Sequence, residues 1–348
     1  MAYTTVNKSS EHFNTKIYTG NQSSTHALTG VGFKPDLTWL KIRSGTGSHY
    51  LYDAIRGVTK SISSDTSSAE LTNSYFSSFN TDGFTLGSAS NNVNGAYNYA
   101  SWNWKAGTTS GITTDSYTTI TPTAYSFNAT AGFSIIKYVG NGTTGAKYPH
   151  GLGVAPKMVI VKNLGTTDWW NVHHASLGNN SEMYLNTANA APSSTGNGTT
   201  PDAVNIELEG TTNTHNASGN NYIAYCFRDV IGYSKFGSYI GNGNADGSFV
   251  YTGFKPAWIM IKNSNSSSEE WNIWDNKRNT FNVMTTRLVA NINGADSVTS
   301  AGFFDFTSNG FKIRSTANGV NQSGNKMIYM CFAEAPLVGT NNVPCTAR

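Results

Sequence analysis

Short apolar segments alternate along this chain of 348 residues with runs of Gly, Asn, Ser and Thr. The apolar segments are rich in Val, Ile, Tyr, Trp, Phe and Thr, and turn-forming residues bound them on both sides, which is the pattern of short β-strands. No window of about eleven residues or more shows the period of an amphipathic helix. The pattern therefore predicts an all-β protein in which any helix is a short turn within a loop.

One set of residues recurs three times along the chain. Each copy starts with Tyr, a variable residue, Gly and Asn, and then reaches a Pro that precedes an apolar strand. A Lys follows this Pro by six residues in every copy (Pro35 and Lys41, Pro156 and Lys162, Pro256 and Lys262). Each copy closes on an aromatic strand, and the last aromatic residues of these strands are Trp104, Phe227 and Phe332. The number of residues from the repeated Pro to the last aromatic residue is nearly the same in the three copies, and it differs only by amounts that a loop can absorb. This indicates one fold with variable loops.

The repeated unit is roughly 100 residues long, and three such units predict three tandem antiparallel β-sandwiches. The predicted divisions are a first sandwich over residues 1–107, a Thr/Ser-rich linker over 108–131, a second sandwich over 132–232, a third over 233–335 and an extended tail over 336–348. The linker has an alternative interpretation as an extended segment that packs along a neighbour. The junction between the second and third sandwiches is so short that it should fix their relative orientation.

The strand that follows the repeated Pro carries apolar side chains on both faces. Because successive strand residues point to opposite faces, this pattern indicates a central strand that is covered on two sides. The predicted core residues come from this strand and from the closing aromatic strand, and they are Trp39, Trp104, Ile160, Phe227, Ile259 and Phe332.

The composition narrows the class of protein. Only 12% of the residues are charged and the net charge is +3, so Asn, Ser, Thr and Gly carry the solubility, as in many secreted, viral and surface β proteins. No Lys/Arg cluster exceeds two residues, which argues against a nucleic-acid-binding surface. There is no apolar run near eighteen residues and no hydrophobic signal core at the amino terminus, so we expect neither membrane insertion nor classical secretion.

The three cysteines do not form a disulfide framework. Cys226 and Cys331 hold equivalent positions in the second and third copies, and equivalent positions in separate sandwiches should lie too far apart to pair. We expect both to be small, buried strand residues, and Cys345 to be an unpaired thiol in a reducing cytoplasm.

No motif is specific for catalysis or for a metal. Glu207 and Glu209 share a strand face, but the other two copies lack the acid at the position of Glu207. A solvated strand face therefore explains the pair better than the paired carboxylates of a glycosidase. His173 and His174 point to opposite faces and cannot easily share one metal ion. We expect a protein that is not an enzyme and that needs no cofactor, although a calcium site made from single acids stays open.

Binding is better supported than catalysis. Each of two predicted strands carries a pair of tryptophans, Trp169 with Trp170 and Trp271 with Trp274. The two members of a pair would point to opposite faces, with Trp170 and Trp271 in the core and Trp169 and Trp274 on the outer face. On that face, Trp169 would lie beside His173 and Trp274 beside Asp275, as in a sugar-binding platform. Packing against a neighbouring domain and contact with another protein are the alternative roles for these aromatic residues.

Several longer segments resemble structural proteins of marine tailed bacteriophages. The resemblance rests on residues 1–5 with 17–21, on 131–136 followed by 150–158, and on 221–227, 237–243 and 345–348. It covers nearly the whole chain. It implies a repeated concanavalin-A/laminin-G-like jelly-roll module in a tail-fibre or virion structural protein, and it brings no catalytic residues to transfer.

We therefore expect a virion structural protein exposed on the particle, foremost a tail-fibre or spike-type adhesin that recognises a host surface glycan. A decoration protein that stabilises the capsid or tail through protein–protein contacts is the alternative, and a polysaccharide depolymerase is disfavoured. The expected partners are other virion proteins, a host glycan and further copies of the chain, with a trimer favoured over other oligomers. Assembly is expected in the host cytoplasm, with residues 1–12 or the tail as docking segments.

Overall fold

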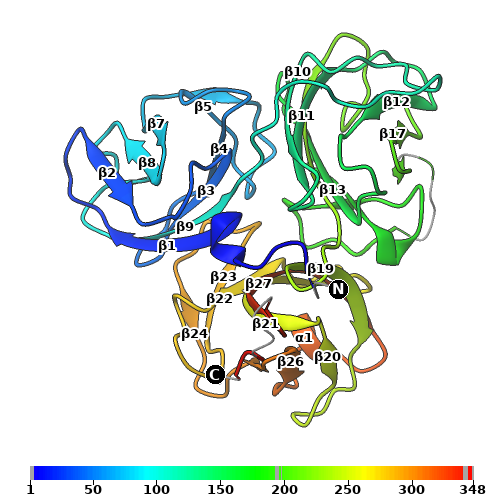
Figure 1. The fold of residues 1–348 in the computed structure, drawn as a ribbon. Coiled ribbons are helices and arrows are strands. Elements are labelled where there is room, and N and C mark those ends of the chain that lie inside the picture. Colours follow the sequence, from blue (N-terminus) through cyan, green and yellow to red (C-terminus); the bar gives the residue numbers. More distant parts are fainter. Residues whose placement is uncertain (1–3, 193–195, 197, 340–343, 347–348) are drawn as a thin grey trace.

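The computed structural model describes residues 4–192, 196, 198–339 and 344–346. Strands make up 41% of the chain and helices 3%, so the all-β prediction is confirmed. Three lobes, which follow one another along the sequence, surround a common centre (Figure 1). Each lobe contains one large and one small antiparallel sheet, and the first lobe has a further pair of short strands. The described residues contain no helix with the length and apolar character that a membrane span requires.

The first lobe spans the first copy of the repeat. Its large sheet has the order β1 (Phe13–Thr19), β9 (Asn98–Trp104), β3 (Leu37–Ile42) and β4 (Tyr50–Asp53). Its small sheet has the order β2 (His26–Thr29), β8 (Gly83–Leu86) and β7 (Phe76–Asn80). The 3-10 helix η1 (Ser9–Glu11) precedes β1, and β5 (Lys60–Ser61) pairs with β6 (Leu71–Thr72).

The second lobe has a wider large sheet. Its order is β10 (Ala124–Asn128), β11 (Phe133–Val139), β18 (Asn221–Phe227), β13 (Met158–Asn163), β14 (Asn171–His174) and β15 (Met183–Tyr184). The small sheet contains β12 (Ala146–Pro149), β17 (Asn205–Leu208) and β16 (Thr199–Pro201), and the 3-10 helix η2 (Ala175–Leu177) follows β14.

The third lobe repeats this plan. Its large sheet has the order β19 (Ser234–Ile240), β27 (Lys326–Pro336), β21 (Phe254–Asn263), β22 (Asn272–Asp275), β23 (Thr286–Val289) and β24 (Ser297–Val298). The small sheet contains β20 (Phe249–Tyr251), β26 (Gly310–Ile313) and β25 (Phe304–Phe306), and the short helix α1 is Asn318–Asn321. In all three lobes the closing strand (β9, β18 or β27) lies between the first strand of the repeat (β1, β11 or β19) and the strand after the repeated Pro.

Each large sheet buries both of its faces. One face packs against the small sheet of the same lobe, which gives three separate sandwich cores. The opposite faces of all three large sheets meet in a fourth core at the centre of the molecule. There the last aromatic residues of the three closing strands contact one another in pairs, with ring centroids 6.3 Å (Trp104 to Phe227), 6.1 Å (Phe227 to Phe332) and 5.8 Å (Trp104 to Phe332) apart.

The six predicted core residues are all buried. Five of them (Trp39, Trp104, Ile160, Phe227 and Phe332) lie in the shared central core, and Ile259 lies in the sandwich core of the third lobe. The prediction of burial is therefore confirmed, but most of these side chains hold the lobes together rather than the two sheets of one sandwich.

Two sets of hydrogen bonds link the lobes around the centre, and the two sets run in opposite senses. Backbone N–H groups donate to carbonyl groups of the neighbouring lobe at three equivalent places: Glu70 to Leu164 (3.0 Å), Ala191 to Ser264 (2.9 Å) and Asp296 to Arg43 (2.7 Å). Ring N–H groups at a second equivalent position do the same: His49 to Val289 (2.8 Å), Trp170 to Ser63 (3.0 Å) and Trp271 to Tyr184 (3.0 Å). Because each lobe uses the same donors toward its neighbour, the arrangement is approximately threefold within one chain.

The repeated Gly-Asn pair has a steric cause. A Cβ atom on Gly20 would lie 1.9 Å from the carbonyl oxygen of Gly95, so only Gly fits where these two backbone segments meet. The N–H of the following Asn21 donates to Oδ1 of the buried Asn94 at 3.0 Å. The same bonds recur in the other lobes, from Asn141 to Asn216 (3.1 Å) and from Asn242 to Asn321 (2.9 Å).

The repeated Lys is fully buried in every lobe. The Nζ atoms of Lys41, Lys162 and Lys262 donate to the carbonyl group of the next residue at 2.8, 2.8 and 2.7 Å. Lys41 and Lys262 also reach carbonyl groups of a neighbouring lobe, at Asn293 (3.2 Å) and Ala188 (3.1 Å). Burial lowers the pKa of each of the three ammonium groups to about 8. The sequence marks this Lys as part of the repeat, but it does not display the contacts that Lys41 and Lys262 make with a neighbouring lobe.

Residues 108–131 pack against the second lobe. β10 pairs with β11 and forms the edge of the second large sheet. The backbone N–H groups of Thr119 and Ile120 donate to the carbonyl group of Lys147 at 3.0 and 2.8 Å. The observed arrangement is therefore that of the alternative interpretation, an extended segment packed along a neighbour.

The three cysteines are unpaired. Cys226 and Cys331 are buried in closing strands, and Cys345 is half-buried, so the expected absence of a disulfide holds for the residues with described positions. Parts of the two proposed docking segments, residues 1–3 at one end and 340–343 and 347–348 at the other, lie outside the described residues.

Candidate functional site

Of the four predicted binding residues, only Trp169 has an exposed side chain. The side chain of Trp169 is 47% exposed, but that of His173 is 1% exposed and those of Trp274 and Asp275 are fully buried. The predicted outer-face platform is therefore wrong for His173, Trp274 and Asp275. The reason is that both faces of each large sheet are covered: His173 and Trp274 lie on the face that packs against the small sheet of their own lobe, and Asp275 lies on the face that packs in the central core.

Trp274 and Asp275 occupy the two opposite faces of β22. The indole of Trp274 lies between the sheets of the third lobe, 5.0 Å from the rings of Phe303 and Phe304. Asp275 faces the central core, where its Oδ2 accepts from Nε of Arg278 at 2.6 Å and from Nε1 of Trp102 at 3.0 Å. Burial raises the pKa of Asp275, but the Arg278 guanidinium outweighs this effect and the net pKa is lowered. Asp275 is thus a buried structural anion between lobes.

The two adjacent histidines lie on opposite faces of β14, as the strand pattern predicts. His173 faces the sandwich interior, and burial lowers its pKa to about 3. His174 faces the third lobe, where Nε2 lies 3.1 Å from the carbonyl oxygen of Tyr329. Among the residues that the structure describes, no group of three or more His, Cys, Asp and Glu side chains is placed to hold a metal ion.

The acidic pair on β17 and the loop beyond it is a surface feature. Glu207 forms an ion pair with Nζ of Lys147 at 2.8 Å, and both side chains are partly exposed. This contact agrees with the solvated strand face that the sequence favours for Glu207.

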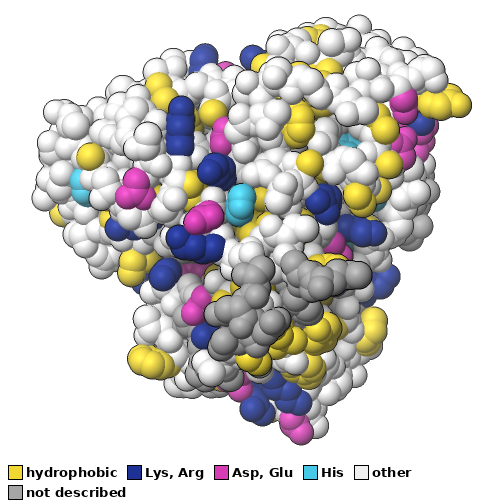
Figure 2. Space-filling view, viewed as in Figure 1, with side chains coloured by type: hydrophobic (Ala, Val, Ile, Leu, Met, Phe, Trp, Pro, Cys, Tyr) yellow, Lys and Arg dark blue, Asp and Glu magenta, His cyan; other side chains and the backbone are white. Residues whose placement is uncertain are grey.

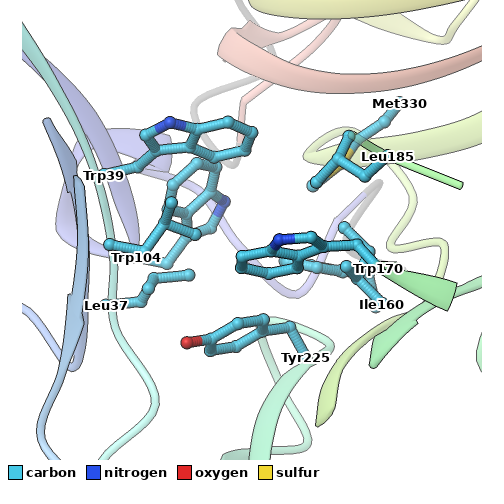
Figure 3. A pocket seen from close by; sticks show the side chains of 10 residues that line it. Leu37, Trp39, Trp104, Ile160, Trp170, Leu185, Tyr225 and Met330 are labelled. Carbon is cyan, nitrogen blue, oxygen red and sulfur yellow. The ribbon is translucent and has the colours of Figure 1, made fainter. Parts of the chain in front are cut away.

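The cavity at the centre of the molecule belongs to the core. It measures about 10 Å³, which is close to the space of one water molecule, and aromatic and aliphatic side chains of all three lobes line it. Figure 3 shows Trp39, Trp104 and Trp170 turned toward this gap, with Tyr225 below them. A space of this size and lining is a packing gap and has no room for a ligand.

Trp169 lies in an open groove of the second lobe. The groove has a volume of about 330 Å³ and is lined by Asp168, Trp169, Glu182, Tyr184, Thr212, Asn213 and Thr214. The neighbouring Trp170 is fully buried and donates to carbonyl groups of the first lobe. Because Trp170 is anchored toward the core, the preceding indole of Trp169 is turned outward.

Contacts within the groove hold Trp169 in place. Its backbone N–H donates to Oδ1 of Asp168 at 2.8 Å, and the N–H of Asp168 donates to the carbonyl group of Ser67 in the first lobe at 2.8 Å. The indole packs on the ring of Tyr184, with centroids 4.7 Å apart and an interplanar angle of 39°. The indole is therefore exposed on one side and supported on the other.

Glu182 is the most strongly positioned polar group of the groove. Its Oε1 accepts from the hydroxyl of Tyr184 at 2.9 Å, and its Oε2 accepts from Nδ2 of Asn171 at 2.9 Å. Burial raises the pKa of Glu182, and these two hydrogen bonds oppose that shift. On the other wall, the hydroxyl groups of Thr212 and Thr214 lie 2.7 Å apart.

The equivalent positions of the other lobes lack this chemistry. The strand register gives the equivalents of Trp169, Tyr184 and Glu182 in the other lobes. They are, in that order, Ser48, Ser63 and Ser61 in the first lobe and Glu270, Val289 and Arg287 in the third. An exposed indole beside a fixed carboxylate is thus a property of the second lobe alone.

Sequence reasoning found Trp169 and missed the residues around it. Glu182 and Tyr184 flank the buried Met183 on β15, so the alternation Glu-Met-Tyr is the signal that places both on one outer face. Their approach to Trp169 depends on the pairing of β14 with β15, which a single sequence does not display.

The face of the molecule in Figure 2 is mostly polar and uncharged. Lys, Arg, Asp and Glu side chains are scattered over it, and no large patch of one sign forms. This distribution agrees with the low charge content of the chain.

Comparison with protein families gives one match. Residues 8–336 match a family model that is described as a domain of unknown function, DUF7483. The searches of curated proteins and of solved structures gave no match.

Proposed function

We propose that this chain, which belongs to the DUF7483 family, is a rigid saccharide-binding module that acts as an attachment protein on a virion surface. The observation that carries the proposal is the groove around Trp169, where an exposed indole lies beside a positioned carboxylate. The virion location rests on the resemblance to tailed-bacteriophage structural proteins.

The groove combines the two kinds of contact that a sugar needs. The exposed face of the Trp169 indole offers an apolar surface for the C–H face of a pyranose ring. Glu182 keeps an acceptor site on each carboxylate oxygen for sugar hydroxyl groups, because an ionised carboxylate has about four such sites and two are used. Bonds to an ionised acceptor are the stronger kind.

The scaffold supports binding without rearrangement. The loop that carries Trp169 is bonded to the first lobe through Ser67, and the strand that carries Tyr184 is bonded to the third lobe through Trp271. A groove held by all three lobes loses little conformational entropy when a ligand binds. The same rigidity and the structural use of the buried ionisable groups favour recognition over catalysis.

A decoration protein is the second candidate, because the third lobe exposes apolar side chains. Ile240 is 54% exposed and Phe249 48%, and Ile231, at the junction with the second lobe, is 72% exposed. Figure 2 shows hydrophobic side chains gathered over this lobe. Contact with another virion protein would cover such side chains.

Calorimetric titration with polysaccharide from the host surface tests the proposed function. We expect wild-type protein to bind, and Trp169→Ala to weaken binding at least tenfold, which corresponds to about 1.4 kcal/mol. Phe281→Ala is the matched control, since Phe281 is 78% exposed on the third lobe and lies outside the groove.

Loss of binding in Trp169→Ala with retention in Phe281→Ala supports the groove as the site. Equal affinities in all three proteins, or release of reducing ends from the polysaccharide, would contradict the proposal.

A further inference from the structure

We infer that the groove selects saccharides by charge: it accepts neutral or amino-bearing sugar residues and excludes acidic ones such as uronic acids. This inference rests on the proposed function and specifies its ligand. It is based on the charged groups that line the groove and on the hydrogen bonds that these groups form within the protein.

The acids of the groove have no accessible cation beside them among the residues with described positions. Asp168 and Glu182 line it, and no Lys, Arg or His does so among the described residues. The ammonium group of Lys162 attracts Asp168 but is fully buried. Its Nζ donates to the carbonyl groups of Asn163 (2.8 Å) and Thr166 (3.5 Å), so it cannot reach a ligand in the groove.

The carboxylate oxygen atoms of these acids that still have free sites can only accept hydrogen bonds. Glu182 has used one site on each oxygen, and Asp168 has used Oδ1 for the N–H of Trp169, which leaves its Oδ2 without a hydrogen-bond partner among the described residues. Donors on a ligand, namely hydroxyl, amino or amide N–H groups, fit these sites. A ligand carboxylate would bring a third negative charge to a partly dehydrated site, where like charges repel more strongly than in water.

The size of the groove favours a short sugar segment. Its volume of about 330 Å³ lies at the lower end of the range of roughly 300–1,000 Å³ that is usual for small-ligand sites. The single exposed indole offers one stacking surface, so one sugar ring of a chain would carry most of the recognition.

Matched oligosaccharides of glucose, glucosamine and glucuronic acid test the inference, with the galactose, galactosamine and galacturonic acid series in parallel. Binding to the full chain is measured by calorimetry at neutral pH, at low and at high salt. In the series that binds, we expect the neutral and amino forms to bind at least tenfold more tightly than the uronic form, and high salt to narrow the difference because it screens the repulsion.

Glu182→Gln separates charge from shape. The introduced amide keeps the size of the side chain, and the unpaired Oδ1 of Asn171 can accept from it if the Asn171 amide turns over. In this variant we expect the ratio of the affinity for the neutral form to the affinity for the uronic form to fall by roughly tenfold or more. Glu207→Gln is the control in the same lobe: Glu207 is a surface acid outside the groove, so the preference should stay as in wild type.

The outcomes distinguish this inference from the proposed function. If sugars bind through Trp169 but the uronic form binds as tightly as the neutral form, or if Glu182→Gln leaves the preference unchanged, the charge selection is wrong and the binding function stands. If no sugar of any charge binds, both are overturned.

Discussion

At the scale of single residues, two tryptophans with similar sequence surroundings have opposite roles. Trp169 lies in the open groove, and Trp274 lies between the two sheets of the third lobe. A strand pattern tells which neighbours share a face, but it does not tell whether that face meets solvent. In this molecule both faces of the strand are covered: the face of Trp274 packs against the small sheet of its own lobe, and the opposite face packs in the central core. The strand pattern alone therefore could not show that Trp274 is buried.

Truncation of the two tryptophans should separate these roles. We expect Trp274→Ala to lower the free energy of unfolding by about 3–5 kcal/mol, as loss of a buried indole does. Trp169→Ala should change the free energy of unfolding by less than about 1 kcal/mol, because the side chain is half exposed. Urea denaturation of both variants measures the difference, and a stable Trp274→Ala would contradict its place in the core.

At the scale of elements, the repeated segments are explained by contacts that recur in every lobe. The Gly-Asn pair, the strand after Pro and the closing aromatic strand were all recognisable in the sequence as a framework. Their strand character could be predicted because β-propensity and turn residues are local properties. The burial of Lys41 and Lys262 could not be predicted, because each donates one of its hydrogen bonds to a carbonyl group of another lobe.

The repeated Gly positions give a test of this framework. A Cβ on Gly140 would lie 2.4 Å from the carbonyl oxygen of Ala217, whereas a Cβ on Gly165 would have its nearest neighbour at 3.8 Å. We expect Gly140→Ala to destabilise the protein by roughly 1–3 kcal/mol, as overpacking does, and Gly165→Ala to be nearly neutral. Equal midpoints of thermal unfolding for the two variants would show that the close approach does not matter.

The strand ends at the lobe boundaries give a second test. Asp53 and Arg56 form a fully buried ion pair at 2.5 Å, and the hydroxyl of Tyr225 from the second lobe donates to the same Asp53 oxygen at 2.7 Å. Asp53→Asn removes the closer of the two anions of this buried guanidinium and leaves only Glu70, 3.5 Å from Arg56, so we expect a loss of about 3 kcal/mol in the free energy of unfolding. Lys8→Gln, at an exposed ion pair with Glu11, should change it by less than about 1 kcal/mol.

At the scale of the whole molecule, the three lobes form one body with a shared core. An approximately threefold arrangement is present within a single chain, since equivalent side chains of the three lobes meet at the centre. A lobe taken alone would expose the face that it buries there. We therefore expect one cooperative unfolding transition for the full chain, and two or more separate transitions in calorimetry would contradict the shared core.

Buried histidines should make this body sensitive to acid. Burial lowers the pKa of His150, His174 and His215 to about 4 and that of His173 to about 3, below their ordinary value of 6.5. Between about pH 6.5 and 4 the unfolded chain therefore binds protons that the folded chain does not, so stability falls as the pH falls. The slope is at most about 1.4 kcal/mol per pH unit for each histidine. Urea midpoints across this range measure it, and a constant midpoint would show that these histidines titrate normally.

The central claim is that the exposed face of Trp169 binds a sugar, and a crystal structure with a bound oligosaccharide tests it most directly. The crystal would be soaked with the tightest neutral or amino oligosaccharide from the calorimetric series. We expect one sugar ring stacked on the Trp169 indole, with donor groups directed at Glu182 and Asp168. A sugar bound elsewhere on the molecule, with an empty groove at saturating concentration, would contradict the account.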